Sequence, residues 1–372
     1  MPVDFLGIGA THDGTEISPR SGAAFDRSYT VRLARAHEEN GWDRLLFAYS
    51  SSSPDPSQAA ALVAADTDAI RLVVAHRPNV SAPTYAATSL ATLDQASGGR
   101  VQIHIITGGS TADQAAEGDH LPKDERYDRT REYIRILKKA WTSPTPFDHV
   151  GRHYRIQNFV SDVPPATQPR PLISFGGSSA AAYTVGGAEA DVFALWGEPL
   201  AGTREQIASV DAAAAAAGRA DRPAIQVAFR PIIAPTRAAA EDKAHRILDR
   251  LRDAPRGRPG APENAGSQRL LVQAGAADRH DRALWTSTAA ATGGAGNSTA
   301  LVGTPEVVAA ALLDYYDLGV RHFSARGYDL LTDAVEFGRE VIPLVKAEVA
   351  RREADNARQD RFVAAASAFA LA

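Results

Sequence analysis

An alternation of short apolar strands with helices runs through the chain and limits the possible folds more than any other feature. Eight segments read as buried strands, and a segment with helical character follows each of them. Repeated strand–helix units form parallel sheets, and eight of them favour a closed (β/α)8, or TIM, barrel over an open sheet. The expected strands are Val3–Gly9, Arg44–Ala48, Ile70–His76, Val101–Thr107, Leu172–Phe175, Asp191–Trp196, Ile225–Ala234 and Val320–Arg326.

One barrel domain with two insertions is expected over residues 1–350, since single barrels tolerate long insertions. The first insertion, near 145–165, resembles a hairpin. The second, 253–300, follows the seventh strand and is rich in Pro, Gly and Ala, so we expect an irregular, mobile lid. Residues 351–372 form an Ala-rich tail, expected to be helical. Two longer helices are expected at 128–141 and at about 331–352.

Composition excludes several classes of function. The net charge of −4 comes without a basic stripe, which argues against nucleic acid. The chain has no cysteine, so disulfides and thiol chemistry are excluded, and its scattered histidines predict no metal site. The N-terminus lacks the layout of a signal peptide and no apolar run is long enough to span a membrane. A cytoplasmic protein is therefore expected.

The segment Pro171–Ser179 carries the clearest candidate binding motif. Gly176 and Gly177 permit a sharp turn after the fifth strand, and Ser178 and Ser179 open the next helix. Free N–H groups at such a helix start suit a phosphate. The alternative is an ordinary helix cap after a glycine turn.

Other polar and aromatic residues fall at the ends of the expected strands. In a parallel barrel those ends converge on the active site, so we expect these residues to form one constellation. It comprises His12, Ser53, His104, Thr107, Ser178, Ser179, Trp196, Arg230 and Tyr328.

Each member also has a plainer interpretation. His12 and Ser53 fit solvated loops, Trp196 fits the core, and Tyr328 fits loop packing. Arg230 lies in an apolar strand, where an unpaired charge is costly, so it meets either a ligand anion or an internal acid. We favour the ligand. This constellation offers an anion site, a cation and an aromatic wall but no pair of acidic residues. A phosphorylated cofactor such as FMN is therefore expected to supply the reactive chemistry.

Short motifs along most of the chain resemble those of FMNH2-dependent alkanesulfonate monooxygenases, within the bacterial luciferase-like flavin group. In order, they are HRPNVSAPT (76–84), ATLD (91–94), GR (99–100), ITG (106–108), ERY (125–127), FGGSS (175–179), WGEP (196–199), GGAG (293–296), TALVG (299–303) and GY (327–328).

This resemblance implies a two-component monooxygenase that uses O2 and acts through a flavin peroxide on a small organosulfur substrate, releasing sulfite and an aldehyde. It implies FMN delivered as FMNH2 by a separate NAD(P)H-dependent flavin reductase, and a homodimer or homotetramer. The implied flavin contacts are Ser53, His104, Thr107, Arg126, Tyr127, Ser178 and Ser179. The implied catalytic and substrate-side residues are His12, Trp196, Arg230 and Tyr328.

Three positions depart from the family pattern. Ser53 replaces a cysteine, Ile232 a histidine and Thr292 a lid arginine, whereas His104 stands where relatives usually have asparagine. Two of these changes remove polar groups that would grip a sulfonate, so a sulfone or another non-sulfonate substrate stays open. A deazaflavin (F420)-dependent oxidoreductase on the same barrel and a non-catalytic flavin-binding protein also fit the sequence.

Overall fold

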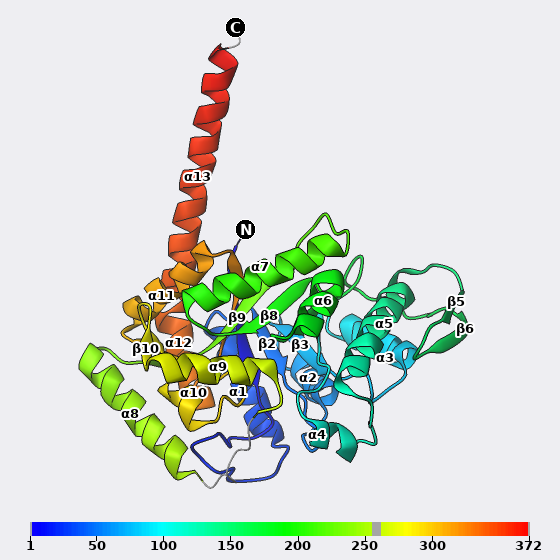
Figure 1. The fold of residues 1–372 in the computed structure, drawn as a ribbon, viewed down its shortest axis with the longest axis horizontal. Coiled ribbons are helices and arrows are strands. Elements are labelled where there is room, and N and C mark those ends of the chain that lie inside the picture. Colours follow the sequence, from blue (N-terminus) through cyan, green and yellow to red (C-terminus); the bar gives the residue numbers. More distant parts are fainter. Residues whose placement is uncertain (1, 255–261, 371–372) are drawn as a thin grey trace.

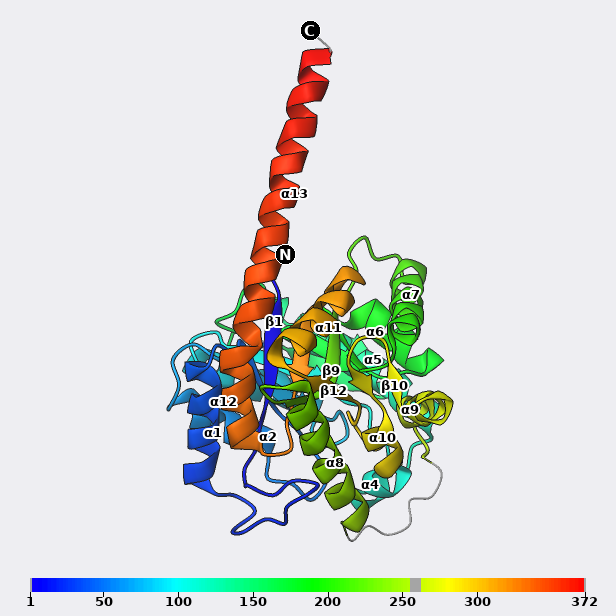
Figure 2. The ribbon, with the colours of Figure 1, turned by 90° about the vertical axis from the view of Figure 1, so that its left-hand side faces the viewer.

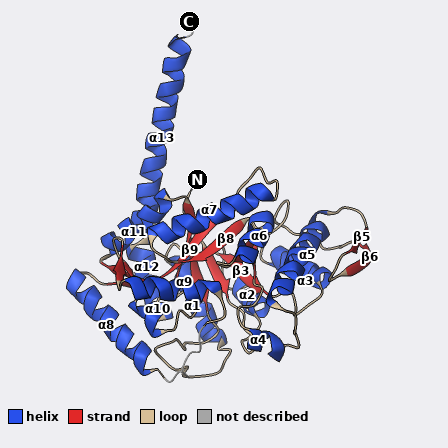
Figure 3. Cartoon of the chain, in the orientation of Figure 1, coloured by secondary structure: helices blue, strands red, loops and turns tan. Residues whose placement is uncertain are grey.

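A closed barrel of parallel strands, surrounded by helices, forms the centre of the molecule (Figures 1 and 3). The computed structural model describes residues 2–254 and 262–370, with side chains as far as residue 358. The barrel order is β1-β2-β3-β4-β7-β8-β9-β13, and β13 pairs with β1 to close it. These strands are β1 (Asp4–Gly9), β2 (Arg44–Phe47), β3 (Arg71–His76), β4 (Val101–Ile105), β7 (Leu172–Gly176), β8 (Val192–Trp196), β9 (Ala224–Ile233) and β13 (Val320–Ala325). The predicted (β/α)8 barrel is confirmed.

Along each strand, successive side chains point alternately to the apolar core beneath the helices and to the barrel interior. In β4, Ile103 and Ile105 belong to the apolar core packed beneath the helices, whereas His104 lines an internal cavity. In β7, Phe175 belongs to the core and Ser174 lines the cavity. Successive side chains on a strand point to opposite faces, so polar residues within these apolar runs face inward.

Side chains cap several of the helices around the barrel. Asp55 accepts from the first turn of α2, and Thr304 caps α11, each with Pro in the first turn. The helices that follow the barrel strands are α1 (Arg27–Glu39), α2 (Pro56–Ala64), α3 (Pro83–Ala96), α5 (Lys123–Thr142), α6 (Ala180–Glu189), α7 (Leu200–Ala216), α8 (Arg237–Asp253), α11 (Pro305–Asp317) and α12 (Leu330–Glu340). The helix expected at 128–141 begins earlier, at Lys123, and α4 (Thr111–Ala116) precedes it.

The insertion after the fourth barrel strand is the expected hairpin, made of β5 (Phe147–Val150) and β6 (Arg155–Phe159). The expectation of an irregular 253–300 segment is wrong for its described part. That part holds α9 (Ala265–Ala276), β10 (Arg279–His280), β11 (Leu284–Trp285) and α10 (Ser287–Ala291). Residues 255–261 of the predicted lid lie outside the described residues.

This insertion is attached to the barrel through β9, which is longer than the other barrel strands. Residues 225–229 of β9 pair with β13, and residues 230–233 pair with β12 (Ala300–Gly303). β12 continues into β11 and β10. A small sheet therefore extends from the barrel where β9 leaves it, and it places the insertion beside Arg230.

The C-terminal segment is two helices where one was expected at 331–352. α12 ends at Glu340, and α13 (Ile342–Ala370) begins with Pro343 in its first turn, where a missing N–H is tolerated. α13 first packs against α11 and α12 and then projects away from the barrel (Figure 2). The expected helical tail thus continues α13 as far as residue 370, and residues 371–372 lie outside the described residues.

Candidate active site

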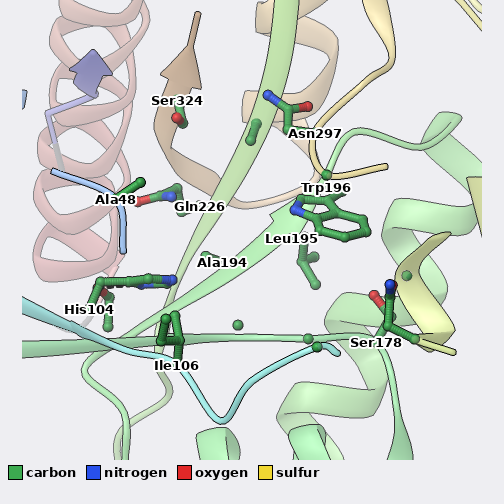
Figure 4. Close-up of a pocket in the computed structure, with 18 of the residues that line it drawn as sticks. Ala48, His104, Ile106, Ser178, Ala194, Leu195, Trp196, Gln226, Asn297 and Ser324 are labelled. Carbon is green, nitrogen blue, oxygen red and sulfur yellow. Dashed lines mark hydrogen bonds between the residues drawn. The ribbon is translucent and has the colours of Figure 1, made fainter. Parts of the chain in front are cut away.

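A cavity of about 520 Å³ lies at the carboxyl ends of the barrel strands, where active sites of such barrels occur (Figure 4). Its inner wall includes Leu6, Leu46 and Val73 from the first three strands, and its rim comes from the loops that follow the strands. Figure 4 shows His104 and Ser178 on opposite sides of this space, with Trp196 on a third side. The cavity therefore reaches from the turn between β7 and α6 to the barrel interior.

The turn between β7 and α6 forms one end of the cavity. Gly177 has φ of +144°, and a Cβ added there would lie 2.7 Å from the Cβ of Ala182. Ser179 caps α6 by accepting from the N–H of Ala182 at 3.2 Å. Ser178 and Ser179 both line the cavity, so the start of α6 faces it. This geometry supports the anion site predicted from the sequence.

Two residues of α5 border the same end. Tyr127 lines the cavity, and its hydroxyl lies 3.5 Å from the Oγ of Ser179. Lys123 also lines it and adds an exposed cation that the sequence analysis did not select. Arg126, in contrast, is buried behind the wall and donates to the carbonyl of Leu121 at 2.8 Å, so it does not line the cavity.

His104 and Thr107 occupy the region of the cavity wall formed by the end of β4. The Nδ1 of His104 lies 3.0 Å from the Oγ of Ser174 on the neighbouring strand β7. Burial lowers the pKa of His104 to about 4, so the imidazole is neutral at physiological pH. Thr107 donates to the hydroxyl of Thr130 at 3.3 Å. Both predicted positions therefore line the cavity.

Arg230 lines the cavity but is paired with an acid. Its Nη2 lies 2.5 Å from Oε1 of Glu16, and its Nε and Nη1 donate to the carbonyls of Asn297 and Gly327 at 2.8 and 3.2 Å. The structure shows the other interpretation, pairing with an internal acid, although Arg230 also lines the cavity. An internal acid compensates the charge because an isolated guanidinium is costly to bury.

Arg326 shares the same carboxylate, with Nη1 2.9 Å from Oε1 of Glu16. Burial and the neighbouring Arg230 lower the pKa of Arg326 to about 10 although Glu16 opposes them, so Arg326 stays charged at neutral pH. Burial raises the pKa of Glu16, but the two guanidiniums outweigh it and hold that pKa at about 2. Two cations therefore face one anion, which leaves this wall with one net positive charge.

Trp196 lines the cavity as predicted, and α9 of the insertion packs onto it. A Cβ at Gly266 would lie 2.7 Å from the ring, so only glycine permits this close approach. Asn264 and Gly266 also line the cavity. Arg269 ties α9 to the end of β8 through two 2.8 Å bonds to the buried Glu198. The described part of the insertion thus forms one wall of the site.

Besides Arg126, three more predicted residues do not reach the cavity. Tyr328 is buried behind Arg230, whose guanidinium carbon lies 5.1 Å from the ring centroid, and burial raises the pKa of its phenol. The Nδ1 of His12 accepts from the N–H of Gly14 at 3.0 Å within its own loop. The Oγ of Ser53 donates to the carbonyl of Ser50 at 2.9 Å. Local hydrogen bonding, the plainer interpretation, accounts for the last two.

The two altered sulfonate-side positions also lie away from the cavity. Ile232 is fully buried among the side chains of α8 and β12, and the Oγ1 of Thr292 donates to the carbonyl of Thr288 at 3.0 Å. Arg326, which lies just after β13, supplies a guanidinium that sequence reasoning missed. Its signal was an arginine at a strand end, the same pattern that selected Arg230.

The other overlooked lining residues are polar positions inside apolar strands or near loop glycines. They are Glu16, Ser174, Gln226, Asn264, Asn297 and Ser324. Among the residues that the structure describes, no group of three or more metal-binding side chains occurs, and no helix is long and apolar enough to cross a membrane.

Comparison with known families decides the class of protein. The family described as luciferase-like monooxygenase matches residues 7–322, most of the chain. The chain belongs to this family. Membership in the luciferase-like group confirms the broad part of the resemblance and the prediction of an oxidoreductase of the flavin monooxygenase kind.

Solved structures of several enzymes share the fold. Riboflavin lyase RcaE, with modified FMN and riboflavin, is 21% identical, covers 94% of this chain and 92% of its own, and gives a TM-score of 0.77. EDTA monooxygenase EmoA from Chelativorans sp. BNC1 is 18% identical, and the match covers 94% of both chains with a TM-score of 0.75. An F420-dependent secondary alcohol dehydrogenase is 15% identical. The match covers 93% of this chain and 99% of the dehydrogenase, with a TM-score of 0.67. Likeness at these identities establishes the fold, and this luciferase-like protein shares it with users of two different cofactors.

Proposed function

We propose that this luciferase-like protein is a two-component monooxygenase that binds reduced FMN and oxygenates a small anionic organosulfur substrate, such as an alkanesulfonate. The observation that carries the proposal is that one cavity is lined both by a helix N-terminus and by the barrel interior. FMN is elongated and carries its phosphate at one end, so it matches both parts of this lining.

The residues at the turn fit the phosphate. Ser178 and Ser179 stand at the start of α6, Gly177 keeps the backbone accessible, and Lys123 adds a cation. The capping bond uses the N–H of Ala182, which leaves the preceding N–H groups of the first turn for a ligand. Helix starts of this kind bind phosphate through backbone N–H groups and the helix dipole.

The isoalloxazine would extend from this turn toward His104 and Thr107, beside Trp196. Bound reduced FMN would supply the two electrons that convert O2 into an oxygenating species. The walls from α9 and the β8 end would exclude water from the reaction. A separate NAD(P)H-dependent flavin reductase is proposed as the source of reduced FMN.

The substrate would lie by Arg230 and Arg326, where the wall has one net positive charge in spite of Glu16. A sulfonate is an anion with several acceptor oxygens, which suits guanidinium donors. With an alkanesulfonate, one oxygen atom would enter the aldehyde carbonyl, the other would leave as water, and the C–S bond would break to release sulfite.

Two measurements test the proposal. The first is titration of the purified chain with oxidised FMN, reduced FMN and reduced F420. The second is turnover with reduced FMN, O2 and a panel of sulfonates and sulfones, with sulfite and organic products identified by mass spectrometry. Sulfite and aldehyde from a sulfonate support the proposal, whereas oxygen-independent turnover with reduced F420 supports a deazaflavin-dependent oxidoreductase. Flavin binding without any oxygenated product would favour a non-catalytic flavin-binding protein.

The homodimer or homotetramer and the cytoplasmic location stay predictions.

A further inference from the structure

The pair His104–Ser174 has a fixed direction of hydrogen bonding. The two residues are register partners on adjacent strands, and Nδ1 of His104 lies 3.0 Å from Oγ of Ser174. The same hydroxyl donates to the carbonyl of Ile103 at 3.2 Å. A serine hydroxyl has one hydrogen, and a carbonyl oxygen only accepts. With that hydrogen directed to Ile103, the Oγ of Ser174 accepts from His104, which places the imidazole proton on Nδ1.

The second ring nitrogen of His104 is then a bare acceptor. Burial keeps the ring neutral by lowering the pKa of His104 to about 4, so Nε2 carries a lone pair and no hydrogen. No described residue hydrogen-bonds to Nε2. His104 lines the cavity, and Figure 4 shows a ring nitrogen directed toward its interior. The site thus presents an acceptor without a donor partner from the described part of the chain.

The oxidation states of a flavin differ in what they offer to such an acceptor. Reduced isoalloxazine carries N–H at N5, whereas oxidised isoalloxazine has a lone pair there. An acceptor opposite N5 therefore forms a hydrogen bond with the reduced ring and meets a second lone pair in the oxidised ring. Leaving a buried acceptor unmatched costs more than a single hydrogen bond gains. The N3–H group is present in both states and gives no such discrimination.

We infer that His104, held in one tautomer by Ser174, is a specificity-determining residue that selects reduced over oxidised flavin by accepting from N5–H. This inference rests on the proposed flavin site. Because the chain would receive reduced flavin from another protein and release it oxidised, the selection serves both capture and release. His104 would contact the cofactor, and Ser174 would be a positioning residue that acts through it.

The test compares the dissociation constants of oxidised and anaerobically reduced FMN for the wild type and two variants. We expect the wild type to prefer reduced FMN by about 10- to 100-fold, the effect of one matched buried hydrogen bond. Ser174→Ala frees the ring to place its proton on Nε2, so oxidised FMN should bind more tightly and reduced FMN more weakly. His104→Asn, whose amide can donate or accept, should bind both forms with little preference.

Ser324→Ala removes a different serine hydroxyl from the cavity wall and is the matched control, expected to keep the wild-type ratio. The 15N spectrum of His104 gives an independent readout of the tautomer, with Nδ1 protonated and Nε2 bare. Equal binding of both redox forms by the wild type, or a ratio unchanged in Ser174→Ala, would overturn the inference while leaving flavin binding intact. Failure to bind FMN in either state would overturn the proposed function and the inference with it.

Discussion

Arg230 and Glu16 form an ion pair on the cavity wall, with 2.5 Å between Nη2 and Oε1, although 214 positions separate them in the sequence. Arg326 shares the same carboxylate oxygen at 2.9 Å. The carboxylate therefore holds two buried guanidiniums together, and its removal would leave like charges facing each other. This relationship sets the charge balance of the cavity wall.

Glu16→Gln should destabilise the fold at neutral pH by about 3 kcal/mol, because the buried arginines lose their anion. The pKa of Glu16 is about 2 in the folded chain and 4.5 without these interactions, so its contribution is present above about pH 4.5 and is lost as the pH falls toward 2. Urea denaturation over this range should show the difference between wild type and variant shrinking. Glu39→Gln, at an exposed position on α1, is the control. A constant difference across the range would exclude Glu16 as its source.

Arg230→Met should abolish turnover while FMN affinity changes by less than about threefold, because Arg230 lies on the substrate side of the proposed site. Glu16 keeps Arg326 as its partner in this variant, so no buried carboxylate is left unpaired and a loss of activity can be told from a loss of fold. Steady-state kinetics and FMN titration on the same preparation provide the check. Undiminished kcat would remove Arg230 from the reaction.

Gly177→Ala should weaken FMN binding by about tenfold or more, because a side chain at φ of +144° is strained and its Cβ would lie 2.7 Å from Ala182. Gly109→Ala is the matched control, since Gly109 also lines the cavity but an added Cβ meets nothing within 4 Å. Fluorescence titration measures both affinities. Equal affinities for the two variants would place the phosphate away from the β7–α6 turn.

Arg269→Met should destabilise the attachment of α9 by about 3 kcal/mol, because it leaves the buried carboxylate of Glu198 without its arginine partner. Hydrogen exchange should speed up in α9 more than in the barrel strands. Arg246→Met, at an exposed position on α8, should leave exchange in α9 unchanged. If α9 kept its protection in Arg269→Met, packing of Gly266 on Trp196 would be the main attachment.

The sequence alone determined the barrel, since apolar strands alternating with capped helices bury both faces of a parallel sheet in few other ways. It also determined the turn at Gly177–Ser179, His104, Thr107 and Trp196 as cavity residues, because each stands at a strand end or helix start that the barrel directs inward. Tyr127 was added by the family resemblance. Only the tertiary structure decided the charge balance of the wall. Glu16 lies in an irregular loop, and nothing local indicates that it reaches Arg230 and Arg326.

Tertiary contacts also moved Tyr328, His12, Ser53 and Arg126 out of the cavity, since loop hydrogen bonds and burial behind Arg230 satisfy them elsewhere. The structure of the insertion is another feature that only the tertiary structure decided. Its Pro- and Gly-rich composition predicts an irregular loop, yet α9, β10, β11 and α10 form where β12 extends β9 and where Arg269 meets Glu198. Strand ends follow from local sequence, whereas the pairing of distant charges depends on how the loops pack over the barrel.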